Sequence, residues 1–70
     1  MTSNIDLENL FSYHPPKGDQ ADRYQRLRAA AKEFAEVVVE STPKGADQSA
    51  AIRKIREATM TANAAIACET

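Results

Sequence analysis

Residues 20–41 read QADRYQRLRAAAKEFAEVVVES, and this segment carries the clearest secondary-structure signal in the chain. Its apolar side chains recur at alternating spacings of three and four residues, at Tyr24, Leu27, Ala31, Phe34 and Val38. That spacing places them on one face of an α-helix, in the phase of a coiled coil. The run 37–39 of three valines has mild β propensity, but the preceding Ala, Lys and Glu residues favour a helix. We therefore predict a helix over 20–41.

A second segment repeats this pattern after a clear break. Thr42 precedes Pro43, and Gly45 follows, so the helix should end here and the chain should turn. Beyond the turn the same spacing of three and four returns, at Ile52, Ile55, Thr59, Ala62 and Ile66. We predict a helix over 46–67 that packs antiparallel against the first helix. The predicted fold class is therefore all-α.

The amount of alanine points to association between copies of the chain. The sequence contains 13 alanines among 70 residues, so the helices can approach closely and present a smooth apolar flank. Two helices alone cannot cover that flank, and a single domain of residues 1–70 buries too little surface to be comfortably stable. The single cysteine excludes an internal disulfide as an added source of stability. We therefore predict a homo-oligomer.

A short helix is expected over 4–11, before the hairpin. Ile5, Leu7, Leu10 and Phe11 are its apolar residues, and Ser3 or Asn4 is the expected N-cap. A helix of this length is marginal in water and needs a surface on which to dock. Two surfaces remain open as alternatives, its own hairpin and a neighbouring subunit.

The loop over 12–19 carries chemistry that helix packing does not explain. Tyr13 and the only histidine, His14, are followed by Pro15 and Pro16, which favour an extended backbone. Gly18 permits a sharp turn, and Asp19 is placed to cap the helix that follows with its side chain. We interpret this stretch as a shaped binding loop, although a Tyr13 ring packed in the core is the structural alternative.

Composition excludes several classes of function. A net charge of −1 argues against a general binder of nucleic acid or of membrane surfaces. No apolar run reaches the length of a membrane span, and no secretory signal is visible, so a cytosolic protein is expected. One His and one Cys make neither a metal site nor a recognisable catalytic grouping. We expect no cofactor and no enzymatic activity.

Charge is distributed unevenly along the chain. Residues 17–32 contain five basic side chains and two acidic ones. Lys17, Arg26 and Arg28 therefore stand near the aromatic loop, and such a patch offers donors for phosphate beside planar groups for bases. Arginine is the better candidate, because its guanidinium grips phosphate through two hydrogen bonds. The structural alternative for each arginine is a solvated helix face.

These residues also carry a resemblance to a known family. The chain resembles the small phage proteins that sponge cyclic oligonucleotides to defeat CBASS immunity, and a phage anti-Thoeris protein shares their hairpin domain. The resemblance covers about residues 11 to 67. It rests on the strings Phe11-Ser-Tyr-His-Pro-Pro-Lys-Gly-Asp-Gln20, Arg23-Tyr24, Gln48-Ser49 and Ala62-Asn-Ala-Ala-Ile-Ala67.

The resemblance implies a homohexamer that binds host immune messengers without cleaving them, in the cytoplasm of the infected bacterium. Cyclic dinucleotides such as cyclic GMP-AMP occupy one set of pockets, and in similar proteins cyclic trinucleotides occupy another. By position, Tyr13 matches the aromatic residue that stacks on a base, and Arg28 matches a basic residue near the phosphates. This chain departs from similar proteins at Thr61, where they often have Trp, and at Cys68, where they often have Arg.

Two other classes of function remain open from the sequence. One is a helical DNA-binding regulator that uses Arg23, Arg26 and Arg28, although the near-zero net charge argues against duplex binding. The other is a structural oligomerisation module in which the two prolines only support docking. For the nucleotide-binding interpretation, the candidate ligand-binding residues are Tyr13, His14, Lys17, Arg26 and Arg28.

Overall fold

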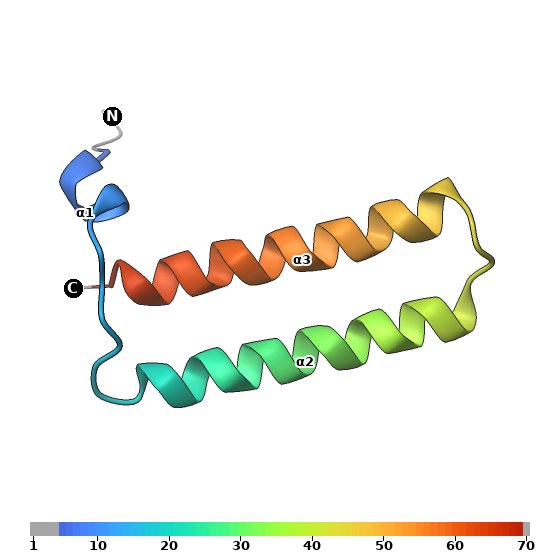
Figure 1. Ribbon diagram of the computed structural model, residues 1–70, viewed down its shortest axis with the longest axis horizontal. Helices are drawn as coiled ribbons and strands as arrows, with labels where there is room; N and C mark the ends of the chain where they lie inside the picture. The colour runs from blue at the N-terminus through green and yellow to red at the C-terminus, as the bar shows by residue number, and fades with distance from the viewer. Residues whose placement is uncertain (1–4, 70) are drawn as a thin grey trace.

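The structure of the chain is a computed structural model that describes residues 5–69. Over this range it contains three α-helices and no strand: α1 (Leu7–Phe11), α2 (Gln20–Ser41) and α3 (Ala46–Ala67). α2 and α3 lie antiparallel as a long hairpin, while α1 projects from its open end (Figure 1). The all-α prediction is confirmed for the described residues, and α2 and α3 have the predicted bounds. The oligomeric state stays a prediction.

The short helix begins later than predicted. Ile5 and Asp6 precede α1, and Asp6 is its N-cap, with its carboxylate accepting a hydrogen bond from the Asn9 amide at 3.1 Å. The predicted caps Ser3 and Asn4 lie outside the described residues. Asp6 suits this position, because its side-chain oxygen satisfies a backbone donor that the first helical turn leaves unpaired.

The predicted capping role of the Asp19 side chain is wrong. Asp19 does occupy the N-cap position of α2, but its side chain makes no capping hydrogen bond. Instead the carboxylate pairs with Arg23 one turn along the helix, with Oδ1 3.2 Å from Nε. The i, i+4 spacing brings these opposite charges together, so the Asp19 carboxylate pairs with Arg23 and not with the free amides at the start of α2. The turn at Gly18 is confirmed by its positive φ of 60°.

The turn between α2 and α3 is closed by polar side chains. Thr42 donates to the Val38 carbonyl from its hydroxyl at 2.7 Å and from its backbone amide at 3.1 Å, and these two bonds close the last turn of α2. Gln48 then reaches back from α3 and donates to the Thr42 carbonyl at 3.1 Å. These contacts fix the closed end of the hairpin.

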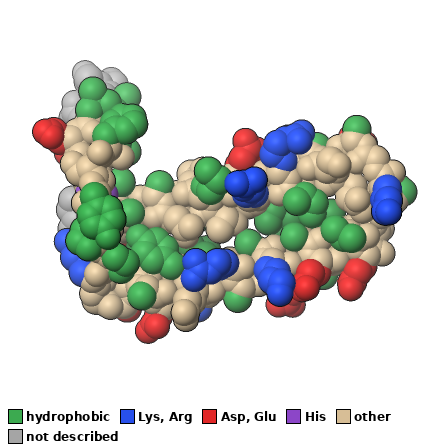
Figure 2. Space-filling model, viewed as in Figure 1, with side chains coloured by type: hydrophobic (Ala, Val, Ile, Leu, Met, Phe, Trp, Pro, Cys, Tyr) green, Lys and Arg blue, Asp and Glu red, His purple; other side chains and the backbone are tan. Residues whose placement is uncertain are grey.

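The chain alone has no fully buried apolar residue in its described part. The residues of the two predicted stripes are half-buried, except for Phe34, which is 59% exposed at the edge of the groove between α2 and α3. Apolar side chains gather along that groove and on the projecting N-terminal segment (Figure 2). The radius of gyration is 15.3 Å, against about 11 Å for a compact chain of this length. The hairpin is thus an extended unit whose apolar surface remains largely uncovered.

Candidate ligand-binding site

The loop over 12–19 lies across the C-terminal end of α3 at the open end of the hairpin (Figure 1). Asn9 donates from its side chain to the Cys68 carbonyl at 3.1 Å, and the Cys68 thiol lies 3.7 Å from the Asn9 carbonyl. The ring of His14 lies with Nε2 at 2.5 Å from that same Asn9 carbonyl. His14 therefore helps to hold the loop in place.

Tyr13 is free of the hairpin. Its side chain is 86% exposed, and that of the nearby Phe11 is 84% exposed. The interpretation of Tyr13 as a core residue of one chain is therefore wrong. Because the loop around it is fastened on both sides, the ring is presented to solvent from a fixed backbone.

Gln20 connects the loop to the hairpin, and it is the only buried residue in the described range, with 3% exposure. Its side-chain oxygen accepts from the Lys17 amide at 3.0 Å. Its side-chain nitrogen donates to the Ile66 carbonyl at 3.0 Å and to a carboxylate oxygen of Glu69 at 3.1 Å. Both ends of this amide are satisfied, as burial of a polar group requires.

Glu69 is also bound by Arg23 through two guanidinium nitrogens, one of which lies 3.2 Å from Oε2. Hydrogen bonds from Arg23 and then from Gln20 hold the pKa of Glu69 below its ordinary value. The same contact with Glu69 raises the pKa of Arg23 above its ordinary value. Arg23 thus carries a carboxylate on each side, since Asp19 lies against its Nε.

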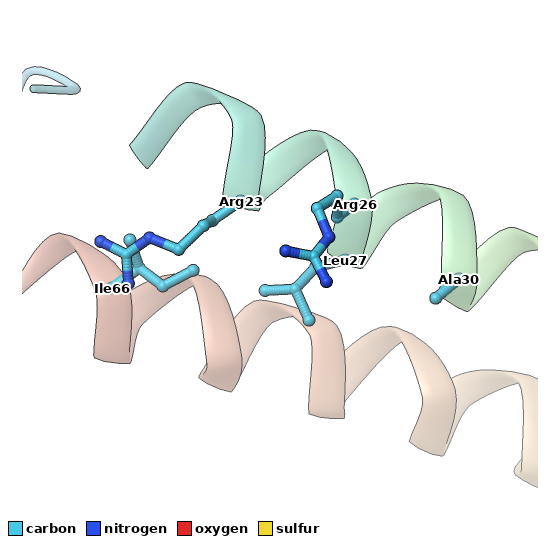
Figure 3. A pocket seen from close by; sticks show the side chains of 5 residues that line it. All are labelled: Arg23, Arg26, Leu27, Ala30 and Ile66. Atoms are coloured by element: carbon cyan, nitrogen blue, oxygen red, sulfur yellow. The ribbon is translucent and has the colours of Figure 1, made fainter. Parts of the chain in front are cut away.

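A pocket of about 480 Å³ lies beside this cluster, between α2 and α3. Arg23 and Arg26 form its charged wall, and Leu27, Ala30 and Ile66 form its apolar wall. Both arginines extend from α2 toward α3 (Figure 3). The combination of guanidinium groups and apolar walls suits a ligand that has both an anionic and a planar part.

Arg28 lies at a different pocket. Two residues apart on a helix, Arg26 and Arg28 point about 200° apart. Arg28 lines a pocket of about 290 Å³ together with Lys32 and Arg56, over a floor that includes Ile52 and Ile55. The predicted site residues therefore fall into three places: the loop (Tyr13, His14, Lys17), the Arg26 pocket and the Arg28 pocket.

Sequence reasoning missed Gln20, Arg23 and Glu69 as parts of one cluster. Gln20 and Glu69 are 49 positions apart, and no local spacing indicates that they meet. The usable signal was the predicted antiparallel hairpin, which brings the start of 20–41 beside the end of 46–67.

Residues 5–69 lack two features that would indicate a metal site or a membrane-spanning helix. This part of the chain contains no group of three or more His, Cys, Asp or Glu side chains that could hold a metal ion. None of its helices combines the length and the apolar character that crossing a bilayer requires.

Comparison with known proteins identifies a family for this chain. No curated protein and no solved structure matches the chain. A family model described as Acb2/Tad1, hairpin domain, matches residues 3–67, which includes the N-terminal helix as well as the hairpin. The chain therefore belongs to the Acb2/Tad1 hairpin-domain family, as its resemblance indicated, and this membership implies an anti-CBASS or anti-Thoeris sponge role.

Proposed function

We propose that this protein sequesters cyclic dinucleotides, such as cyclic GMP-AMP, without cleaving them, and so keeps these messengers from immune effectors in the infected bacterial cell. The family is one of sponge-type binding proteins and is not known for catalysis. The observation that carries the proposal is the exposed Tyr13 ring on a fastened loop. A sponge needs tight stoichiometric binding, and an ordered loop favours it by lowering the entropy lost on association.

In this proposal, base stacking and phosphate binding are carried out by different residues. Tyr13 stacks on a base, which contributes about 1–3 kcal/mol per base. Arg28 binds a phosphate, and Lys17, which lies in the same loop as Tyr13, adds a second positive charge. His14 acts indirectly, because its ring contacts the Asn9 carbonyl and supports the loop.

A second copy of the chain completes the pocket in this proposal. Cyclic GMP-AMP has near two-fold symmetry, so two copies of one chain offer each base the same ring and each phosphate the same cation. The apolar residues of the N-terminal segment support such an assembly, since Ile5, Leu7 and Leu10 are 67%, 62% and 51% exposed in one chain. A neighbouring subunit would cover them. We propose a homohexamer as the complete unit, and binding of cyclic trinucleotides at further sites in it.

The experiment compares Tyr13→Ala and Arg28→Ala by calorimetric titration with cyclic GMP-AMP at two salt concentrations. Both variants should bind more weakly, and Tyr13→Ala by about 1–3 kcal/mol for each base it contacts. The residual affinity of Arg28→Ala should depend less on salt, because fewer charges meet the ligand. Arg53→Ala, which removes an exposed arginine of α3, is the matched control and should bind like the wild type.

Sedimentation of each variant shows whether the assembly is intact. Dissociation caused by Tyr13→Ala would make the ring structural and would contradict the stacking role. A wild-type protein that binds neither cyclic dinucleotides nor cyclic trinucleotides would contradict the sponge function. Duplex DNA is the remaining probe, and binding with a steep salt dependence would favour the DNA-binding alternative instead.

A further inference from the structure

The Glu69 carboxylate is held by the kind of donors that form an anion-binding site. Its carboxylate receives hydrogen bonds from both terminal nitrogens of Arg23 and from the side-chain amide of Gln20. Gln20 is itself buried and is held in place from the loop by the Lys17 amide. A fixed amide donor beside a guanidinium fork is the arrangement that binds planar or tetrahedral oxyanions.

The contact between Glu69 and Arg23 is partly open to solvent. The side chain of Glu69 is 43% exposed and that of Arg23 is 33% exposed, so a solute can reach their contact without unfolding of the hairpin. Exposed ion pairs of this kind contribute little to stability, which means that little is lost when they separate. The carboxylate thus stands where the oxygens of a phosphate group could bind.

The space next to this contact is suited to the rest of a ligand. Arg23 also forms one end of the pocket of about 480 Å³, and Arg26 lies on the same wall. Leu27, Ala30 and Ile66 supply an apolar surface against which a planar group can pack (Figure 3). A phosphate on Arg23 would therefore lie at the edge of a pocket with a second guanidinium in it.

We propose that Arg23, Gln20 and Arg26 form a phosphate-binding site separate from Tyr13 and Arg28, and that Glu69 of the same chain occupies it until a phosphate-bearing ligand displaces the carboxylate. The inference rests on the proposed function only in taking the ligand to be a nucleotide. Glu69 acts as an internal competitor that weakens binding at this site, and it leaves when the ligand delivers its own negative charge.

The test measures the affinity of the full chain for inorganic pyrophosphate by calorimetric titration. Glu69→Gln keeps the shape of the side chain and removes its charge, and Glu69→Ala removes the group altogether. Both should bind pyrophosphate more tightly than the wild type, by about two- to fivefold, the range that an exposed ion pair supports. Glu57→Gln is the control, since it makes the same change in net charge at an exposed position of α3.

The increase in pyrophosphate affinity of the Glu69 variants must depend on Arg23. Adding Arg23→Ala to Glu69→Gln should abolish the gain, whereas adding Tyr13→Ala should preserve it, because pyrophosphate has no base to stack. Three results would overturn the inference: no measurable binding of pyrophosphate, an equal gain in Glu57→Gln, or affinity that is unchanged or weaker in both Glu69 variants. The last result would make Glu69 a structural tether for the end of α3.

Titration of the same proteins with cyclic GMP-AMP separates this inference from the proposed function. A wild-type protein that does not bind cyclic GMP-AMP, combined with an Arg23-dependent gain in pyrophosphate affinity, would contradict the proposed binding of cyclic dinucleotides and support the site. Binding of cyclic GMP-AMP through Tyr13, with no pyrophosphate gain in either Glu69 variant, would support the sponge function and refute the site.

Discussion

Gln20 joins three segments that are far apart in the sequence. Its amide contacts the loop at Lys17, the last turn of α3 at Ile66 and the C-terminal side chain of Glu69. Burial of a polar side chain is tolerated when its polar atoms are hydrogen-bonded, and both the oxygen and the nitrogen of this amide have partners. At the open end of the hairpin, hydrogen bonds therefore hold the loop in position. Apolar packing within one chain does not do so there.

This role predicts that replacing Gln by Glu lowers stability much more at position 20 than at position 25. Gln20→Glu removes the donor to Ile66 and places a carboxylate beside Glu69, so the free energy of unfolding should fall by about 1–3 kcal/mol. Gln25→Glu, at an exposed position of the same helix, should change it by less than about 0.5 kcal/mol. Chemical denaturation of both variants at neutral pH checks the prediction.

Lowering the pH should reduce the difference in stability between Gln20→Glu and Gln25→Glu. The neighbouring Glu69 raises the pKa of the new carboxylate in the folded state above its unfolded value, so protonation favours the fold. The deficit of Gln20→Glu relative to Gln25→Glu should thus be largest at neutral pH and shrink as the pH falls through the carboxyl range. Equal stability of the two variants at neutral pH would show that the Gln20 contacts contribute nothing.

At the scale of elements, the loop between α1 and α2 is shaped by one turn. Gly18 has a φ of 60°, in the left-handed region, and an added Cβ there would meet no atom within 4 Å. A side chain at this position is therefore disfavoured by backbone strain and not by crowding. The turn redirects the chain from the extended prolines into α2.

Two substitutions at Gly18 separate strain from the loss of glycine itself. Gly18→Ala should reduce the free energy of unfolding by about 1–2 kcal/mol, because alanine resists the left-handed conformation. Gly18→Asn should reduce it by less, since asparagine adopts that conformation more readily. Thermal unfolding of both variants is the measurement, and an equal loss in both would argue that the turn is not held at this φ in solution.

The elements themselves could be predicted because their signals are local. The spacing of apolar residues from Tyr24 to Val38 defines α2, and the Thr42–Pro43 pair marks its end. The start of α1 and the role of Asp19 could not be predicted, because several side chains compete for the same donors and only geometry decides between them. The Gln20 cluster likewise depends on contacts between segments more than 40 positions apart.

The candidate site could be predicted in part for the same reason. The loop over 12–19 stands out by its rings and prolines, and the structure does expose Tyr13 there. The grouping of Arg26 with Arg28 as one basic patch was wrong, because proximity in sequence is not proximity on a helix surface. The two arginines line separate pockets.

In the whole molecule, one chain leaves much of its apolar surface uncovered. Its described part has no buried apolar residue, and large apolar side chains remain exposed along both helices, among them Phe34 at 59%, Val39 at 54% and Met60 at 59%. Exposed apolar surface on this scale marks an interface. We expect copies of the hairpin to cover one another along the groove between α2 and α3.

A charge in that groove should therefore break assembly and stability together. Ala58 is exposed in one chain but lies in the groove beside Leu27 and Phe34. Ala58→Glu should dissociate the oligomer and lower its melting temperature, because burial of an unpaired carboxylate costs several kcal/mol and a small domain has little stability in reserve. Ala29→Glu, on the polar side of α2, is the matched control and should remain assembled. Sedimentation at micromolar concentration checks both, and a wild-type protein that sediments as a stable folded monomer would contradict the assembly itself.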